Sequence, residues 1–322
     1  MVNNATIEQF NNEAFTTMQQ SNNNLLQVNP SAEKSRITSF IKTVLQKTGF
    51  QNVVIGLSGG LDSTTSFYLL KEAVFPQNIF IAHLYYFDSQ LKDIEPILKQ
   101  SGVPKENIYN LSIKPFVKTF QTHLRGVPQA QHHLGGGRLR SHDSSEVIGT
   151  SSEANRIRSK LHLEGGQMDS FEVERVRLGN IMARVRMIIL YDLSKKHNAL
   201  VCGTENKSEY LLGYFTRFGD AASDFEPIQH LYKTQVYQLA SSLGVPKNII
   251  KKTPTAGLWH GQTDEGEFGF SYKEADEVLF YYYDKKLKLE EIKNKGFKNA
   301  EKIIKFSLKN SYKHHAPYTL TL

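Results

Sequence analysis

An apolar run passes into a glycine-rich loop in the stretch Val53-Val54-Ile55-Gly56-Leu57-Ser58-Gly59-Gly60-Leu61-Asp62-Ser63. A helical pattern follows at once. A strand that passes through small residues into a helix aims backbone N–H groups and the positive helix end at one place, which is the geometry of a phosphate cradle. The glycines permit positive φ and close approach to an anion. Asp62 adds a carboxylate that a polyphosphate tolerates only through a cation such as Mg²⁺.

Two common nucleotide-binding loops do not fit this stretch. It lacks the Gly-Lys-Ser/Thr ending of a Walker A loop and the Gly-x-Gly-x-x-Gly of a dinucleotide fold. The pattern Ser-Gly-Gly-x-Asp-Ser instead resembles the loop of the ATP pyrophosphatases, or PP-loop enzymes. That resemblance implies binding of the β,γ-diphosphate of ATP and its release as one unit. The alternative is a glycine-rich turn without a ligand.

Composition bounds the class of protein. A chain of 322 residues suits one large α/β domain with extensions, or two small ones. The net charge of +7 favours polyanionic partners, although many of its lysines fall in the last forty residues and suit a solvated helix face. The single cysteine, Cys202, lies in an apolar run and is expected to be buried. No internal disulfide is then possible, which favours a cytoplasmic protein.

Targeting and membrane segments are not expected. No stretch approaches the roughly 20 apolar residues of a membrane span, so we expect no membrane partner. No Lys or Arg precedes Lys34, which argues against a signal or transit peptide.

Strands and helices alternate from residue 35 onward. Four apolar runs predict buried strands, and each is followed or preceded by a helical stripe. The strands are expected at 53–57, 78–84, 107–111 and 199–203, and the helices at 35–45, 64–70, 93–100 and 177–195. This alternation predicts an α/β fold with a doubly wound parallel sheet, flanked by helices, with a ligand at the carboxyl ends of the strands. Residues 271–308 predict two or three further helices.

Two segments do not show this alternation of strands and helices. Residues 1–30 are rich in Asn and Gln and are predicted to be an extension outside the core, so that one domain spans 31–322. Residues 121–170 lack periodicity and predict a long flexible insertion. Metal ligation within it is the weaker interpretation, because no fixed spacing with supporting partners relates its candidates, His132, His133, His142 and Asp143.

A second group of polar residues follows the fourth strand, in Gly203-Thr204-Glu205-Asn206-Lys207-Ser208-Glu209. At the carboxyl edge of a parallel sheet these residues would face the same crevice as the loop at 56–63. Glu209 and Asp62 could then share Mg²⁺, which takes one or two carboxylates together with phosphate oxygens and waters. The alternative is that Glu205 and Glu209 form a pair on an exposed helix turn.

Further polar residues suit the same nucleotide. Lys233 could neutralise a phosphate, and Thr255 offers a hydroxyl beside the nucleotide, with a solvated turn as its alternative. Aromatic, Arg and Asp residues interleave at 213–224, which suits a planar, charged heterocycle.

In their order and spacing, these motifs resemble ammonia-dependent NAD synthetase over about residues 35–317. The matching segments are Gly179-Asn180, Ala183-Arg184, Arg186-Met187, Gly203-Thr204-Glu205-Asn206, Ser208-Glu209, Gly213-Tyr214-Phe215-Thr216-Arg217, Gly219-Asp220, Asp224, Lys233, Pro254-Thr255-Ala256, Gln262-Thr263-Asp264-Glu265 and Ser271-Tyr272. The resemblance implies the adenine nucleotide alpha hydrolase-like fold. It also implies attack of the nicotinate carboxylate of deamido-NAD on the ATP α-phosphate, followed by displacement of AMP by ammonia.

The resemblance also implies roles for individual residues, carried over by position. The implied catalytic residues are Asp62, Lys233 and Asp224. The implied metal ligands are Asp62 and Glu209, holding Mg²⁺. ATP would contact Gly56, Leu57, Ser58, Gly59, Gly60, Leu61, Asp62, Ser63, Thr204, Lys233 and Thr255. Deamido-NAD would contact Arg184, Arg217, Asp224 and Lys313. The loop at 258–268, rich in Gly and acidic residues, is the candidate lid that would keep water from the adenylate.

The resemblance has limits. The chain reads His83-Leu84-Tyr85-Tyr86-Phe87, Ala221-Ala222 and Tyr312-Lys313-His314 where the family has Arg with Pro-Tyr/His-Gly, Gly-Gly and His-Lys-Arg. The family forms homodimers, so a homodimer is implied. No attached glutaminase domain is expected, so ammonia is the implied nitrogen donor. The alternatives are a related enzyme that amidates another carboxylate or modifies tRNA, and a regulatory nucleotide-binding module. No nucleic acid partner is expected, because no RNA-binding module or catalytic cysteine pair is visible.

Overall fold

The sheet consists of four parallel strands. In the computed structural model, which describes residues 24–88, 91–125, 170–315 and 317, the strands are β1 (Asn52–Gly56), β2 (Ile79–Tyr85), β3 (Ile108–Ser112) and β4 (Ala199–Cys202). Their order is β3-β2-β1-β4, and every pair is parallel. All four predicted strands are confirmed to within a residue or two. The three central apolar residues of β1, at 53–55, are fully buried, as a strand covered on both faces requires.

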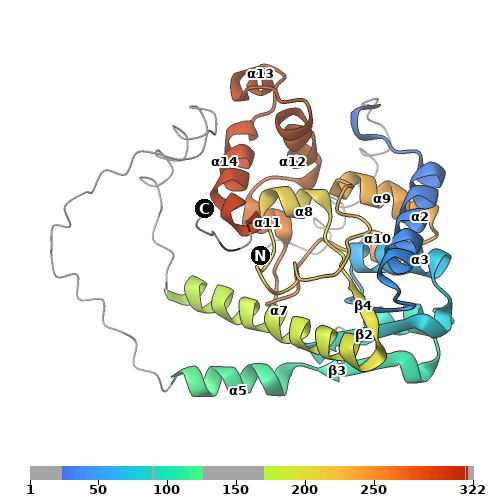
Figure 1. Ribbon diagram of the computed structural model, residues 1–322. Coiled ribbons are helices and arrows are strands. Elements are labelled where there is room, and N and C mark those ends of the chain that lie inside the picture. Colours follow the sequence, from blue (N-terminus) through green and yellow to red (C-terminus); the bar gives the residue numbers. More distant parts are fainter. Residues whose placement is uncertain (1–23, 89–90, 126–169, 316, 318–322) are drawn as a thin grey trace, which may run out of the picture.

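Helices cover both faces of the sheet, which confirms the doubly wound α/β prediction (Figure 1). On one face, the side chains of β1 and β2 pack with the helices α2 (Pro30–Thr48), α3 (Leu61–Ala73), α4 (Leu91–Lys99) and α9 (Lys233–Ser242). On the other face, they pack against α5 (Lys114–Arg125) and α7 (Ser170–His197). The predicted helices are confirmed, and α7 begins seven residues before the expected 177.

The chain changes faces between β3 and β4. The connections β1-α3-β2 and β2-α4-β3 run over one face of the sheet, whereas α5 and α7 lie on the other face before β4. The strand order therefore reverses between β1 and β4, the two strands that stand side by side. In open α/β sheets, ligands bind outside the carboxyl ends of the strands at such a switch point. The fold thus places the loop after β1 and the loop after β4 at the edge where a ligand is expected.

A second core is built from the carboxyl-terminal helices. It joins α8 (Lys207–Leu212), α11 (Asp264–Phe268), α12 (Tyr272–Leu279), a π-helical turn η5 (Phe280–Asp284), α13 (Leu289–Lys293) and α14 (Ala300–Asn310). Tyr281, Tyr282 and Tyr283 pack against this core. The remaining short elements are η1 (Asn24–Leu26), η2 (Pro76–Asn78), η4 (Lys105–Asn107), α10 (Lys247–Ile250) and η6 (Ser311–His314).

The residues just before α2 pack against the body of the protein. Leu26 is buried within the second core, and Gln238 of α9 bonds both its carbonyl and the Val28 amide. Within the segment expected to lie outside the core, Leu26 and Val28 therefore contact the body of the protein. Asn29 then caps α2 by accepting from the Ala32 amide, with Pro30 as the first helical residue.

Most of the expected insertion lies outside the described residues. Its ends are helical, because α5 runs to Arg125 and α7 begins at Ser170. The candidate ligands between residues 132 and 143 therefore fall outside the described part of the chain. None of the helices in the described ranges combines the length and apolar character needed to cross a membrane.

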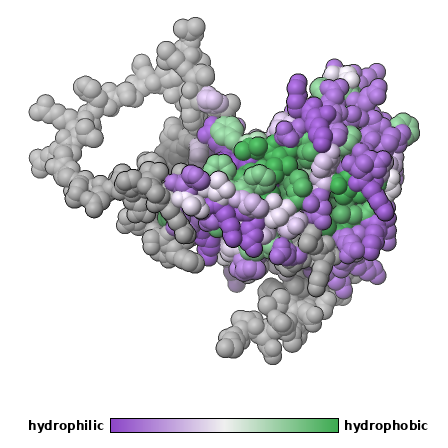
Figure 2. Space-filling view, turned by 90° about the horizontal axis from the view of Figure 1, so that it is seen from below, coloured by the Kyte–Doolittle hydropathy of each residue, from purple (hydrophilic) through white to green (hydrophobic). Residues whose placement is uncertain are grey.

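Large apolar side chains are exposed on the face that carries α5 and α7. Figure 2 shows hydrophobic residues gathered in the middle of this face, with hydrophilic residues around them. Five large apolar side chains are exposed on these two helices, namely Phe116, Phe120, Val173, Val176 and Ile188. We call these five residues the α5/α7 patch. Exposed apolar residues that gather on one face mark interaction sites.

Candidate active site

A cavity of about 420 Å³ lies at the switch point of the sheet. Its walls come from the loop after β1, the ends of β2 and β4, the inward side of α7 and the segment 252–258. A cleft of this size at this position is the expected ligand site of an open α/β sheet.

The loop after β1 forms one wall of the cavity. Every residue from Gly56 to Ser63 except Gly59 lines it. Gly59 has φ of +76°, which a side chain would disfavour. The hydroxyl of Ser58 accepts from the Gly60 amide at 3.2 Å, and α3 begins directly afterwards at Leu61. The amino terminus of a 13-residue helix therefore points into the cavity, as the phosphate-cradle prediction requires.

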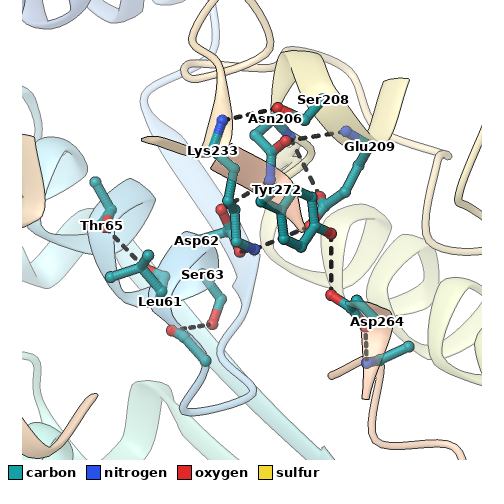
Figure 3. Close-up of polar contacts among 12 residues, drawn as sticks. Leu61, Asp62, Ser63, Thr65, Asn206, Ser208, Glu209, Lys233, Asp264 and Tyr272 are labelled. Carbon is teal, nitrogen blue, oxygen red and sulfur yellow. Dashed lines mark hydrogen bonds and ion pairs between the residues drawn. The ribbon is translucent and has the colours of Figure 1, made fainter. Parts of the chain in front are cut away.

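Three charged residues meet at the end of this loop (Figure 3). The Nζ atom of Lys233 lies 2.5 Å from Oδ2 of Asp62 and 3.1 Å from Oε1 of Glu209. The side chain of Lys233 is only 3% exposed. The other Asp62 oxygen accepts from Asn206 at 3.0 Å. Residues 144 and 171 positions away from Asp62 thus converge on one carboxylate.

The start of α8 positions Glu209. Asn206 caps the helix by accepting from the Glu209 amide at 3.0 Å, while the Glu209 carboxylate accepts from the Asn206 amide. This capping box fixes both side chains relative to β4. The sequence offered the Asn-x-x-Glu spacing as a signal for it, but our sequence reasoning gave Asn206 no role.

Hydrogen bonds to buried polar residues fix the backbone position of Lys233. Ser208 accepts from the Lys233 amide at 2.8 Å and donates to Asp276 at 2.5 Å, and Asp276 also accepts from the Thr234 amide. Asp276 is fully buried, and burial raises the pKa of its carboxyl to about 6. The ring of Tyr272 lies 5.1 Å from the Lys233 ammonium and its hydroxyl donates to Asp264. Sequence reasoning missed Asp276.

Charge in this cluster is unbalanced. Burial raises the pKa of Glu209 to about 8. The positive charge of Lys233 lowers this pKa, whereas the negative charges of Asp62 and Asp264 raise it. Burial alone would lower the pKa of Lys233, but the carboxylates of Asp62 and Glu209 hold it well above its usual value. One ammonium therefore faces three carboxyl groups, and the surplus of oxygen donors suits a further cation.

The donor set fits Mg²⁺ bound together with phosphate. Carboxylate oxygens are the ligands that Mg²⁺ prefers, and those of Asp62 and Glu209 already converge on one cation. Within the described residues no group of three or more His, Cys, Asp or Glu side chains forms a protein-only metal site. Mg²⁺ here would depend on oxygens from a bound polyphosphate.

The other expected nucleotide contacts line the same cavity. Thr204 follows β4, and Thr255 lies in the segment opposite, where its hydroxyl accepts from the Gly257 amide. Lys313 also lines the cavity, although its ammonium donates to the carbonyls of Gly213 and Phe215. Arg186 and Asp220 are further lining residues to which sequence reasoning assigned no role.

Three of the expected substrate contacts do not line the cavity. Arg184 is exposed on α7 and donates to the Arg217 carbonyl at 3.2 Å, and Arg217 in turn donates to the His315 carbonyl. The carboxylate of Asp224 accepts a hydrogen bond from the Val201 amide at 2.7 Å, and this bond attaches residue 224 to strand β4. Within the single chain, Asp224 thus lies outside the cavity in which it was expected to act.

The prediction of a lid loop at 258–268 is wrong for the second half of that segment. Residues Asp264–Phe268 form α11 instead of a loop, and Phe268 is 2% exposed within the second core. A side chain buried there cannot swing over a ligand without unfolding its surroundings. Before α11, Leu258 packs against Gly179 and Trp259 lies 4.6 Å from the Arg175 guanidinium, so α7 holds this segment too.

Comparison with known proteins agrees with this geometry. The family model described as NAD synthase matches residues 33–142 and 143–317. A curated NH₃-dependent NAD⁺ synthetase from Thermococcus kodakarensis is 37% identical over 268 residues, covering 83% of this chain and 87% of the relative. One from Fusobacterium nucleatum is 33% identical, covering 91% and 97%.

Solved structures resemble the fold over most of the chain. An NH₃-dependent NAD synthetase from Campylobacter jejuni superposes with a TM-score of 0.64 at 27% identity, covering 91% of this chain and all of that one. An NMN synthetase from Francisella tularensis superposes with a TM-score of 0.68 at 26% identity, covering 92% and 100%.

Proposed function

Because the chain belongs to the NAD synthase family, we propose that it joins ammonia to the nicotinate carboxylate of deamido-NAD at the expense of ATP. The observation that carries this proposal is the convergence of Asp62, Glu209 and Lys233 on the phosphate-cradle loop. An ATP-dependent ligase needs a site that binds a triphosphate and stabilises departing diphosphate. The products are NAD, AMP and diphosphate.

In the first step, a carboxylate oxygen of deamido-NAD attacks the α-phosphorus of ATP, and the bond from that phosphorus to the diphosphate breaks. The backbone N–H groups around 58–63 and the Lys233 ammonium bind the negative charge that grows on the diphosphate. Charge stabilisation of this kind is usually the largest catalytic contribution. Asp62 and Glu209 would hold Mg²⁺, which when bound neutralises phosphate charge.

In the second step, ammonia attacks the acyl carbon of the adenylate. The carbon–oxygen bond to AMP breaks and the nitrogen loses a proton, which leaves the amide. Both nucleophiles are substrates, so the protein needs no nucleophilic side chain. Cys202, buried beneath the site, has a pKa raised by burial and is unsuited to attack.

Product analysis tests this function. Purified protein with ATP, Mg²⁺, ammonium and deamido-NAD should form NAD, AMP and diphosphate in equal amounts. Formation of ADP would contradict the mechanism. A parallel reaction with nicotinate mononucleotide separates this substrate from the one that the name of the Francisella enzyme implies. Turnover of the mononucleotide alone would overturn deamido-NAD as the substrate.

We further propose a homodimer that pairs through the α5/α7 patch. Arg184, expected to contact deamido-NAD, is exposed on the same helix as Ile188, which is 55% exposed. Its position outside the cavity is explained if the substrate extends from the cavity to a dimer interface. We also propose that 31–322 is one catalytic domain that works in the cytoplasm, where a reduced Cys202 is stable.

Replacing Ile188 with glutamate tests the dimer. A charge buried in an apolar interface without a partner is costly, so we expect monomers and a KM for deamido-NAD at least tenfold higher, with the KM for ATP little changed. Sedimentation and steady-state kinetics measure both. The control is Phe75→Glu, in the loop between α3 and β2, where the side chain is 73% exposed. A dimeric Ile188→Glu variant with normal kinetics would contradict the proposed interface.

A further inference from the structure

Two carboxyl groups lie behind the end of β4, next to the cavity. Glu205 is 8% exposed, and its amide donates to Oε2 of Glu226 at 3.0 Å. Oε2 of Glu205 accepts from Gln229 at 2.9 Å, and Oε1 of Glu226 accepts from Ser223 at 2.7 Å. The remaining oxygen, Oε1 of Glu205, is buried and has no hydrogen-bond partner among the described residues.

The charges around this pair do not balance it. No Lys, Arg or His within the described ranges forms an ion pair with Glu205 or Glu226. Burial raises the pKa of Glu205 to about 9, with Glu226 the next contributor. Lys313 is near enough to be affected by Glu205, yet its ammonium donates to the carbonyls of Gly213 and Phe215. Buried carboxyl groups are normally paired or bind cations.

The pair touches the cavity wall. A Cβ atom added to Gly203 would come within 1.7 Å of Oε1 of Glu226, so the carboxyl group lies directly against that backbone. Gly203 and Thr204 themselves line the cavity. A ligand held by Glu205 and Glu226 would therefore be separated from the cavity by a single segment of backbone.

We propose that Glu205 and Glu226 form a binding site for a large monovalent cation, namely ammonium or potassium. A buried carboxylate oxygen without a partner is an acceptor that such a cation satisfies, and its positive charge offsets the pair. A divalent ion is disfavoured, because Mg²⁺ demands near-ideal octahedral geometry and dehydrates reluctantly, whereas this site is buried. The ammonium form of the proposal rests on the proposed function, in which ammonia is a substrate.

Thermal unfolding without ATP tests cation binding directly. At equal ionic strength, wild-type protein should melt about 2–5 °C higher in ammonium or potassium chloride than in choline chloride, because a ligand that binds only the folded state stabilises it. Glu205→Gln should lose this difference while melting no lower than wild type in choline. If that variant does not fold, Glu226→Gln serves. Glu72→Gln, an exposed residue paired with Lys34, is the matched control and should keep the difference.

Comparison of the three salts identifies the bound ion. Stabilisation by ammonium but not potassium indicates a site for the substrate, whereas stabilisation by both indicates a site for either cation. Equal melting in all three salts would overturn the proposal and assign the buried oxygen to water. Kinetics give a second measurement: Glu205→Gln should raise the KM for ammonium at least tenfold without changing the KM for ATP. If wild-type protein makes NAD but melts at the same temperature in all three salts, the cation site is refuted and the proposed function stands.

Discussion

Replacing Lys233 with methionine should slow turnover at least about a hundredfold and weaken the fold. Methionine fills much of the same volume but leaves Asp62 and Glu209 without their shared cation. Removing one partner of a buried ion pair costs about 3–5 kcal/mol, because the other charge stays buried and uncompensated. Loss of the ammonium also removes stabilisation of the departing diphosphate, worth about 10²–10³-fold in rate.

Two measurements separate these effects. Diphosphate release per active site measures the rate of adenylation, and denaturant unfolding measures the free energy of unfolding. Lys293→Met is the control, because this lysine makes ion pairs on the surface with Glu290 and Glu301 that solvent screens. Its stability and rate should match those of wild type. A Lys233→Met protein that releases diphosphate within tenfold of the wild-type rate would remove Lys233 from the catalytic step.

The strands were predictable because of how parallel sheets are buried. Residues of β1 and β2 touch helices on both faces, so each strand is a continuous apolar run bounded by polar residues. Their parallel direction followed from the alternation with helices, and the ligand edge followed from that direction. The start of α7 was predicted less accurately, because residues 173, 174, 176 and 177 are exposed and give no sustained apolar periodicity that would indicate a helix.

The site was predictable only in part. Asp62 and Glu209 follow two strands whose ends had to meet, so their proximity could be inferred from topology. Asp276 could not be found in this way, because an acidic residue on a helix usually faces water. Its burial depends on Ser208 and Thr234 packing around it, a contact between segments that local patterns do not encode.

The placement of Arg184 and Asp224 has a different reason. A resemblance to a family predicts which residues contact a substrate. It does not predict whether those residues lie in the cavity of one chain or on its outer surface. Asp224 binds the Val201 amide, and Arg184 projects from the exposed side of α7. The lid prediction failed because glycine and acidic residues at 258–268 suggested a loop. Phe268, the apolar residue at its end, was the signal that the segment is anchored.

The stability of the protein should fall as pH rises from about 5 to 9. Burial raises the pKa of Glu205 to about 9 and that of Glu226 to about 7, against an ordinary value near 4.5. Groups with a raised pKa bind more protons in the folded state, so their contribution is complete below the unfolded pKa and is lost as pH rises through the folded pKa. Each proton difference contributes up to about 1.4 kcal/mol per pH unit. Glu209 and Asp276, whose pKa values burial raises to about 8 and about 6, add to this loss, which should be steepest below pH 7, where most of these groups contribute.

Denaturant unfolding across this pH range in choline buffer measures the slope. Glu205→Gln should make the slope shallower by the contribution of one group, because the variant carries no proton at that position to lose, whereas Glu72→Gln should leave the slope unchanged. Equal slopes for wild type and Glu205→Gln would contradict a raised pKa for Glu205 in the folded protein. Repeating the series in ammonium or potassium chloride joins this prediction to the cation site. A bound cation stabilises the ionised pair, so the slope in those salts should be shallower than in choline.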